Sequence, residues 1–153
     1  MPTNPIQPMT LCVIRDEGRV LLAMKKRSFG KGNWNGYGGK LNPGESIEQA
    51  LVREVKEEST LDLHEYEKRG EIFFHFPDAT HHVHIYEGIK YSGVPTETEE
   101  MSPQWFSISD IPYDTMWPDD KEWYPYFLNK ISFVGNVSFD ADYKIISIEI
   151  KKV

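Results

Sequence analysis

The 153-residue sequence has one cysteine, fewer positive than negative charges, and no long apolar run. The single cysteine, Cys12, excludes an intrachain disulfide, and we therefore expect a reducing compartment, the cytoplasm. The 17 basic and 24 acidic residues give a formal charge of −7, which argues against binding to nucleic-acid polymers or anionic membranes. No apolar run approaches the ~18 residues that cross a membrane, and the first residues lack a secretory-signal pattern.

What the chain does contain is a series of strand and helix patterns typical of one mixed α/β domain. Its length fits a single domain, which we place at residues 9–153, after a loose tail at residues 1–8 that holds three prolines. The pattern indicates no clear dimer interface, and we expect a monomer. Strands are predicted at 9–15, 19–27, 71–76, 81–91, 104–108, 131–139 and 143–150, helices at 46–59 and 120–131, and loops at 28–45, 93–103 and 111–120.

The first predicted helix carries acids on the side that should face the protein. Ser46 and Gln49 have the spacing of a capping box, which marks the start of the helix. On a wheel of 100° per residue, Glu54 and Glu58 fall in the middle of the apolar face and Glu57 at its edge. A run of charges is more often a solvated face, but such a run should lie opposite the apolar stripe.

Carboxylates that face the protein need positive charge beside them, because leaving them unpaired costs several kcal/mol each. Arg53 and Lys56 point elsewhere on the wheel, so they cannot supply all of it. A hard divalent cation is the simplest partner, with Mg2+ expected near phosphate and Mn2+ as a substitute. The preceding segment GYGGKLNPGE supplies glycines for close backbone approach and Lys40 for an anion, which indicates a phosphate cradle.

The spacing of these residues resembles a known family. Gly39, five residues, Glu45, seven residues and then REVKEESTL is similar to the Nudix box of nucleoside diphosphate-linked hydrolases. The resemblance implies a Nudix α/β/α sandwich, with a mixed curved sheet between helices, and Mg2+-dependent attack of water on a diphosphate linkage. The family has glycine where this chain has Thr60, at a left-handed helix end that costs a β-branched residue about 1–2 kcal/mol.

The family pattern also implies roles for the residues of this motif. Glu58 or Glu54 would help to activate water, and Arg53 would pair with Glu45 to orient the helix. The implied metal ligands are Glu54, Glu57, Glu58 and the carbonyl of Gly38.

Two further stretches closely resemble one branch of the family. MKKRSFGKGNWNGYGGK (24–40) and MWPDDKEW (116–123) are similar to oxidised-purine nucleoside triphosphatases of the MutT-homologue type, which hydrolyse 8-oxo-dGTP to its monophosphate. The similarity runs from about residue 9 to residue 131 and includes EEMSPQWF, whose Glu100 would join the metal site. The resemblance implies that the substrate is a small damaged purine nucleotide, oxidised or methylated, and that the role is sanitation of the nucleotide pool.

The second stretch supplies side chains that suit a purine base. Trp117 offers a flat face for stacking, worth about 1–3 kcal/mol per base. If Asp119 and Asp120 both turn into one apolar pocket, one should keep its proton, so that the pair offers a donor and an acceptor. Asn35, which has a donor and an acceptor, could read the remaining edge. The resemblance adds, as substrate contacts, Thr10, Lys25, Phe29, Tyr37, Gly38, Gly39, Lys40, Phe74, Phe76, Pro118 and Trp123.

Several of these patterns have simpler interpretations. The PDD motif before the second helix is also typical of an N-cap, and Phe74 and Phe76 are more often core residues on pattern alone. His82 and His84 share a strand face, but we assign them no metal, because nothing nearby supplies further soft ligands. His81 stands where the branch has an apolar residue near the base, which leaves the ranking of damaged purines open.

Two other functions compete with this hypothesis. One is a Nudix hydrolase for another nucleotide, such as a dinucleoside polyphosphate or a nucleotide sugar, and WNGYGGK together with MWPDD argues against it. The other is a nucleotide-binding domain without turnover, which should have lost the acids of the motif, whereas this chain keeps them.

Overall fold

The computed structural model describes residues 5–153. The first four residues of the expected N-terminal tail lie outside this range. The strands are β1 (Ile6–Asp16), β2 (Arg19–Lys25), β3 (Trp34–Asn35), β4 (Tyr37–Lys40), β5 (Asp62–His75), β6 (Thr80–Ser92), β7 (Met101–Ser107), β8 (Phe133–Phe139) and β9 (Ile145–Lys152); the helices are α1 (Ile47–Ser59) and α2 (Asp120–Leu128), with 3-10 turns at Ile108–Asp110 and Tyr113–Thr115.

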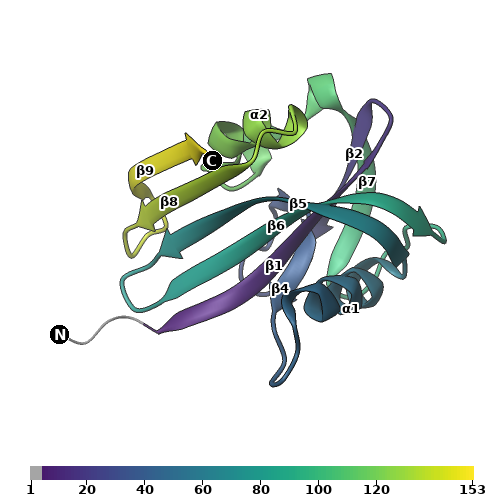
Figure 1. Ribbon diagram of the computed structural model, residues 1–153, viewed down its shortest axis with the longest axis horizontal. Coiled ribbons are helices and arrows are strands. Elements are labelled where there is room, and N and C mark those ends of the chain that lie inside the picture. Colours follow the sequence, from purple (N-terminus) through teal and green to yellow (C-terminus); the bar gives the residue numbers. More distant parts are fainter. Residues whose placement is uncertain (1–4) are drawn as a thin grey trace.

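The strands form one mixed sheet in the order β3-β2-β1-β6-β5-β8-β9, with β4 paired to β1 and β7 paired to β2 (Figure 1). The pairs β1–β6 and β5–β8 are parallel, and the other pairs are antiparallel. The Gly-containing strand β4 is thereby held directly against β1, ahead of helix α1.

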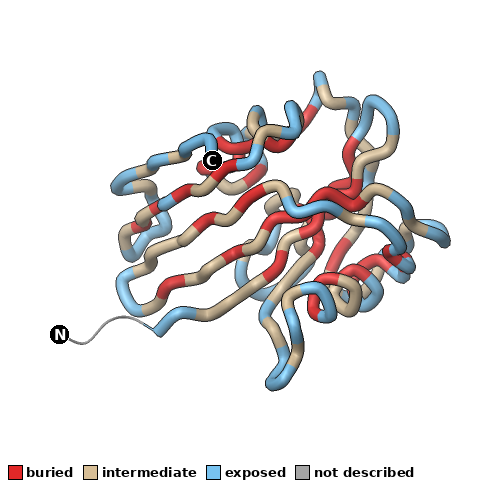
Figure 2. Tube along the Cα trace, viewed as in Figure 1, coloured by how far each residue is buried: buried red, intermediate tan, exposed pale blue. Residues whose placement is uncertain are grey.

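Side chains of each central strand alternate between two hydrophobic cores, so that α1 and α2 cover opposite faces of the sheet. Cys12 and Ile14 of β1 pack in a core with Leu51 of α1, whereas Val13 packs in a core with Trp123 of α2. Figure 2 shows this burial along the central strands. The α/β/α arrangement expected from the sequence is confirmed.

The structure corrects the expected boundaries at the start of the chain. Strand β1 begins at Ile6, so residues 6–8 of the expected tail pair in parallel with β6 instead. Strands β3 and β4 lie inside the expected loop at 28–45, because pairing with β2 and β1 overrides the low strand propensity of glycine.

Later boundaries also differ: β7 begins at Met101, inside the expected loop at 93–103, and α2 ends at Leu128 rather than at residue 131. Strand β5 begins at Asp62, nine residues before the expected start at residue 71, and pairs with β6 from there. The sequence did not indicate this first half because it holds mostly exposed charged residues and few buried ones. Helix α2 forms as predicted, although Pro125 lies inside it rather than in its first turn. Within residues 5–153, neither helix combines the length and apolar character required to cross a membrane.

Candidate active site

The start of α1 is fixed by the capping box that the sequence predicts. The Ser46 hydroxyl accepts a hydrogen bond from the Gln49 N–H at 3.1 Å, and the Gln49 side chain accepts one from the Ser46 N–H at 2.9 Å. From this start, Glu58 is buried and Glu54 is largely covered, whereas Glu57 is 58% exposed. The prediction that Glu54 and Glu58 turn toward the protein is therefore confirmed.

Arg53 forms ion pairs with three acids of this motif, Glu45, Glu54 and Glu57. Its Nε lies 2.7 Å from Glu45 Oε2, and its Nη1 lies 2.8 Å from Glu54 Oε1 and 3.1 Å from Glu57 Oε2. Its Nη2 donates to the Lys40 carbonyl at 3.0 Å, which ties α1 to β4. The expected pair of Arg53 with Glu45 is confirmed. The wheel was wrong only about the reach of Arg53, whose long side chain bends back along the helix surface. It compensates Glu54 and Glu57 directly.

Glu58 has a different environment. Its Oε1 accepts a hydrogen bond from the Gly38 N–H at 2.9 Å, and no ion pair to it is found among residues 5–153. Burial raises the pKa of Glu58 to about 8; the Gly38 N–H opposes this rise and the charge of Glu54 adds to it. A bound cation would lower this pKa and keep the carboxylate charged at neutral pH.

The glycines before α1 bring backbone against this acid. A Cβ on Gly38 would lie 1.9 Å from the Thr10 carbonyl oxygen, so another residue cannot occupy this position without moving β1. A Cβ on Gly39 would lie 3.0 Å from the carboxylate of Glu54. The two glycines therefore allow β4, β1 and the end of α1 to meet at one place.

Glu100 lies close enough to Glu58 to contribute to its raised pKa. It is paired with Arg27, whose Nε lies 2.9 Å from Glu100 Oε1, and with Lys25, whose Nζ lies 3.3 Å from Oε2. These contacts lower the pKa of Glu100, chiefly through the hydrogen bond from Arg27. Glu100 would have to exchange these partners to bind a metal, and its role as a ligand stays a prediction.

The donors at this end of α1 fit a hard divalent cation. Glu54, Glu57 and Glu58 offer carboxylate oxygens, and Gly38 offers a backbone carbonyl, which is the oxygen-only chemistry that Mg2+ and Mn2+ prefer. The buried Glu58, which forms no ion pair among the described residues, although the charge of Lys25 acts on it, is the observation that carries this fit.

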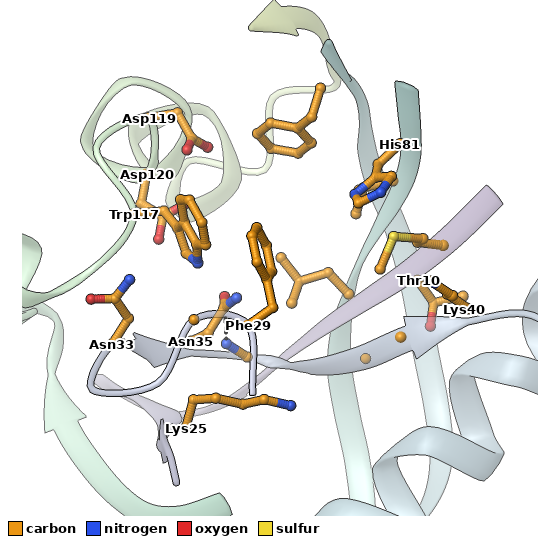
Figure 3. A pocket seen from close by; sticks show the side chains of 18 of the residues that line it. Thr10, Lys25, Phe29, Asn33, Asn35, Lys40, His81, Trp117, Asp119 and Asp120 are labelled. Atoms are coloured by element: carbon orange, nitrogen blue, oxygen red, sulfur yellow. Dashed lines mark hydrogen bonds between the residues drawn. The ribbon is translucent and has the colours of Figure 1, made fainter. Parts of the chain in front are cut away.

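A cavity of about 410 Å³ runs from Glu58 to the start of α2. Figure 3 shows Trp117, Asp119 and Asp120 on one side of it and Lys40 on the other. The expected substrate contacts that line it are Thr10, Lys25, Phe29, Asn35, Gly38, Gly39, Lys40, Phe74, Phe76, Trp117, Asp119, Asp120 and Trp123. The lining residues not expected as contacts are Met9, Leu11, Ser28, Gly30, Asn33, Gly36, Val83 and Met101, and His81 lines the cavity at the position expected near the base.

Asp119 and Asp120 both turn into the cavity, where Trp123 connects them. Trp123 Nε1 lies 3.0 Å from Asp119 Oδ2 and 3.2 Å from Asp120 Oδ1. The other oxygen of each carboxyl is buried and has no hydrogen-bond partner within residues 5–153. These two oxygens are therefore available to a ligand.

Burial raises the pKa of Asp119 from 3.8 to about 6. Burial also raises the pKa of Asp120 well above its usual value, and the charge of Asp119 adds to this rise. The prediction that one member of the pair keeps its proton at neutral pH agrees with these shifts. The alternative of a simple N-cap is wrong, because the Asp119 side chain makes no capping hydrogen bond.

Aromatic rings close the cavity around this pair. Phe29, which is 52% exposed, packs on Trp117 with ring centroids 5.0 Å apart. Phe74 and Phe76 line the cavity and also contact the core beside α2, so both interpretations of these residues hold. Tyr143, from the turn between β8 and β9, contacts the ring of Phe29 at 5.3 Å. Nothing in the sequence around Tyr143 indicated this position.

Two expected substrate contacts need correction, and a third is already partly engaged. Tyr37 does not line the cavity: it pairs with Cys12 in register, and both side chains face the core beneath α1. Pro118 is exposed outside the cavity. Asn35 points into it, but its carbonyl oxygen already accepts a hydrogen bond from the Gly36 N–H at 2.9 Å. Asn33, at the end of the loop before β3, adds an amide beside Asn35 that we did not predict (Figure 3).

The sheet between two helices and the acidic helix end define a Nudix-type domain. The chain belongs to the NUDIX domain family, whose pattern matches residues 5–127. It is 46% identical to the oxidized purine nucleoside triphosphate hydrolase of Danio rerio over 147 residues, which cover 95% of this chain and 94% of that protein. It is 44% identical to the protein of the same name from Mus musculus, over 94% of each chain.

Comparison with solved structures supports the same fold. The crystal structure of a MutT protein from Bacillus halodurans superimposes with a TM-score of 0.85 at 23% sequence identity, over 95% of this chain and 97% of that chain. The MutT protein from Methanosarcina mazei superimposes with a TM-score of 0.73 at 23% sequence identity, over 85% of this chain and 98% of that one. At these identities the likeness concerns the fold alone.

Proposed function

We propose that this protein is a divalent-metal-dependent pyrophosphohydrolase that converts damaged purine nucleoside triphosphates to monophosphate and diphosphate. The observation that carries the proposal is a single cavity that joins the acidic end of α1 to the paired acids Asp119 and Asp120. One end suits a metal-bound polyphosphate and the other suits a purine base. The function of the vertebrate relatives supports the same assignment.

The acidic end would hold Mg2+, or Mn2+ in its place, through Glu54, Glu57, Glu58 and the Gly38 carbonyl. When bound, the cation screens the polyphosphate and polarises its P–O bonds. Glu58, or Glu54 beside it, takes the proton of the attacking water. Arg53 holds Glu45, Glu54 and Glu57 in place through its fixed fork of donors.

At the other end, the base lies against Trp117 and its edge meets the two aspartates. With one proton between them, Asp119 and Asp120 present an acceptor and a donor in a buried setting. An 8-oxoguanine edge offers N–H donors to the acceptor, and relocation of the proton suits an oxidised adenine. The amide of Asn33 or Asn35 meets the remaining edge.

The cellular setting follows from the same proposal. A small nucleotide is the partner, in a monomeric enzyme of the cytoplasm that removes damaged purines before polymerases use them. The single buried cysteine, Cys12, and the formal charge of −7 support a reducing compartment without nucleic-acid or membrane binding.

The test is pyrophosphate release with Mg2+ across a panel of normal, oxidised and methylated nucleoside triphosphates, together with a dinucleoside polyphosphate and a nucleotide sugar. We expect kcat/KM to be highest for oxidised purines and turnover to stop when a chelator removes divalent ions. Preference for the dinucleoside polyphosphate or the nucleotide sugar would reject the purine assignment. Turnover that ignores the chelator would reject the metal assignment.

A further inference from the structure

A cluster of nitrogen and oxygen ligands lies on the face of the sheet opposite the base cavity. Glu71 of β5 and His82 and His84 of β6 each offer one ligand atom, and these atoms all lie within 4.8 Å of one another. From the sequence we assigned no metal to the two histidines. The pairing of β5 with β6 supplies the third ligand, because Glu71 lies directly opposite His84.

Alternation along β6 separates this cluster from the cavity. Val83 and Ile85 face the core beside α2, and His81 lines the base cavity, so His82 and His84 point to the other side of the sheet. Their side chains remain 21% and 12% exposed, which leaves a path for a small ion.

The two rings are held in place by their neighbours. The rings of His82 and His84 have centroids 4.2 Å apart, and Phe73 stacks on His82 at 4.0 Å with an interplanar angle of 13°. His82 Nε2 lies 2.5 Å from Glu71 Oε1. The three ligands are therefore already in mutual contact before any ion arrives.

A positive charge already lies beside the cluster. Lys68 Nζ lies 2.6 Å from Glu71 Oε2 and 3.0 Å from His84 Nδ1. An ammonium group has no lone pair to offer, so His84 Nδ1 must be the acceptor and its lone pair faces a cation. The Lys68 side chain is 39% exposed and can turn into solvent.

We propose that Glu71, His82 and His84 form a second divalent-cation site, suited to Zn2+ or a similar borderline metal and distinct from the hydrolytic site. Two imidazoles and one carboxylate are a known ligand set for zinc with an open fourth position, and imidazole nitrogen disfavours Mg2+. Zn–N bonds of about 2.0–2.1 Å require the side chains to close by on the order of 1 Å. Lys68 leaves as the ion enters.

A metal at this site would affect the cavity from the opposite face of the sheet. It would cross-link β5 and β6, which present Phe74 and His81 to the cavity on their other face. The hydrolytic site offers carboxylates and a carbonyl, so the two sites select different metals by ligand type. The proposal is independent of the substrate assignment, because its test requires no turnover.

The test is calorimetric titration of Zn2+ into protein without an affinity tag, in the presence of excess Mg2+ to occupy the acidic site. We expect one Zn2+ per chain to remain bound. In NMR spectra of the histidine rings, His82 and His84 should shift while His64 and His75 do not. Complete displacement of Zn2+ by Mg2+ would overturn the proposal.

Variants make the assignment specific. His84→Asn should weaken Zn2+ binding by at least the roughly 10–100-fold that loss of a supporting contact costs. His75→Asn is the matched control. His75 lies on β5, on the same face of the sheet as Glu71, but its side chain is hydrogen-bonded to Asn136, so this variant should bind Zn2+ as wild type does. Lys68→Gln should tighten binding by roughly 2- to 5-fold, the scale of an exposed ion pair. Equal affinity in His84→Asn, or weaker binding in Lys68→Gln, would overturn the proposal.

Discussion

The two ends of the cavity place buried carboxylates in opposite settings. At the end of α1, Glu58 meets a backbone N–H, and Arg53 draws the neighbouring acids together. At the start of α2, Asp119 and Asp120 meet one indole N–H and a wall of rings. Burial raises the pKa of acids at both ends, but the first end exposes oxygens to a hard cation and the second favours a retained proton. In the proposed function, the same functional group thus serves metal binding at one end and base recognition at the other, according to its neighbours.

The largest effect should come from the metal end. Glu58→Gln keeps the size of the side chain and an acceptor for the Gly38 N–H but removes the charge and the proton acceptor. We expect kcat to fall by at least about 100-fold, measured as pyrophosphate release at saturating substrate. Glu48→Gln, on an exposed position of the same helix, is the control and should leave kcat unchanged. A rate near wild type in Glu58→Gln would reject its assigned role.

The raised pKa of Asp119, at the end of the cavity near α2, should change how the free energy of unfolding depends on pH. In the folded protein Asp119 keeps its proton up to about pH 6, whereas at its usual pKa of 3.8 the unfolded chain releases it earlier. Between pH 3.8 and about pH 6 the folded state therefore binds more protons than the unfolded state. As pH rises through this range, the group lowers the free energy of unfolding. Asp119→Asn should remove this loss, on the order of 2 kcal/mol between pH 4 and pH 7.

Chemical denaturation of wild type and Asp119→Asn at several pH values measures this difference. Asp114→Asn, an exposed change just before α2, serves as the control and should follow the wild-type curve. Parallel curves for wild type and Asp119→Asn would show that the acid is ionised normally in the folded protein.

The same variant sharpens the comparison through substrate choice. Asp119→Asn replaces a titratable acceptor with a fixed amide, so discrimination between 8-oxo-dGTP and dGTP should change by about 10-fold, the scale of one hydrogen bond. The ratio of kcat/KM values for the two nucleotides measures it. The Mg2+ concentration at half-maximal rate should stay the same. A shift in Mg2+ dependence with unchanged discrimination would reverse the roles assigned to the two ends.

The smallest expected effect lies at the end of α1. Thr60 caps this helix in the left-handed region, with φ 69° and ψ 3°, where the family has glycine. Thr60→Gly should raise the free energy of unfolding by about 1 kcal/mol and leave kcat unchanged. Lys56→Gly, at a helical position, should instead lower it by about 1 kcal/mol. Destabilisation by Thr60→Gly would show that the Thr60 hydroxyl, which donates to the Val94 carbonyl at 3.3 Å, outweighs the strain.

Sequence periodicity was sufficient to predict the inward acids of α1, and the family resemblance implied the α/β/α sandwich. The angular position of Glu54 and Glu58 follows from helix geometry, which does not depend on the rest of the fold. The reach of Arg53 did not follow, because a wheel places Cβ atoms and not the end of a long side chain. The same limit applies to Tyr37, whose direction depends on its register against β1.

Residues brought in by other elements were the hardest to predict. Tyr143 enters the aromatic wall from a turn more than a hundred residues after Phe29, and Glu71 meets His84 through strand pairing. Strand β4 was not predicted, because its segment is rich in glycine, which has a low strand propensity. It forms because it pairs with β1. Motif spacing located the acids, whereas contacts between distant strands required the structure.

His81 and His82 are consecutive in the chain, yet His81 lines the cavity and His82 belongs to the cluster with Glu71 and His84 on the reverse face of the sheet. A change at His81 therefore alters the lining of the cavity directly, whereas a change at His82 can reach the cavity only through the strand that the two residues share. Two neighbouring side chains joined by a single peptide bond thus face two different chemical environments, because successive residues of a strand point to opposite sides of the sheet.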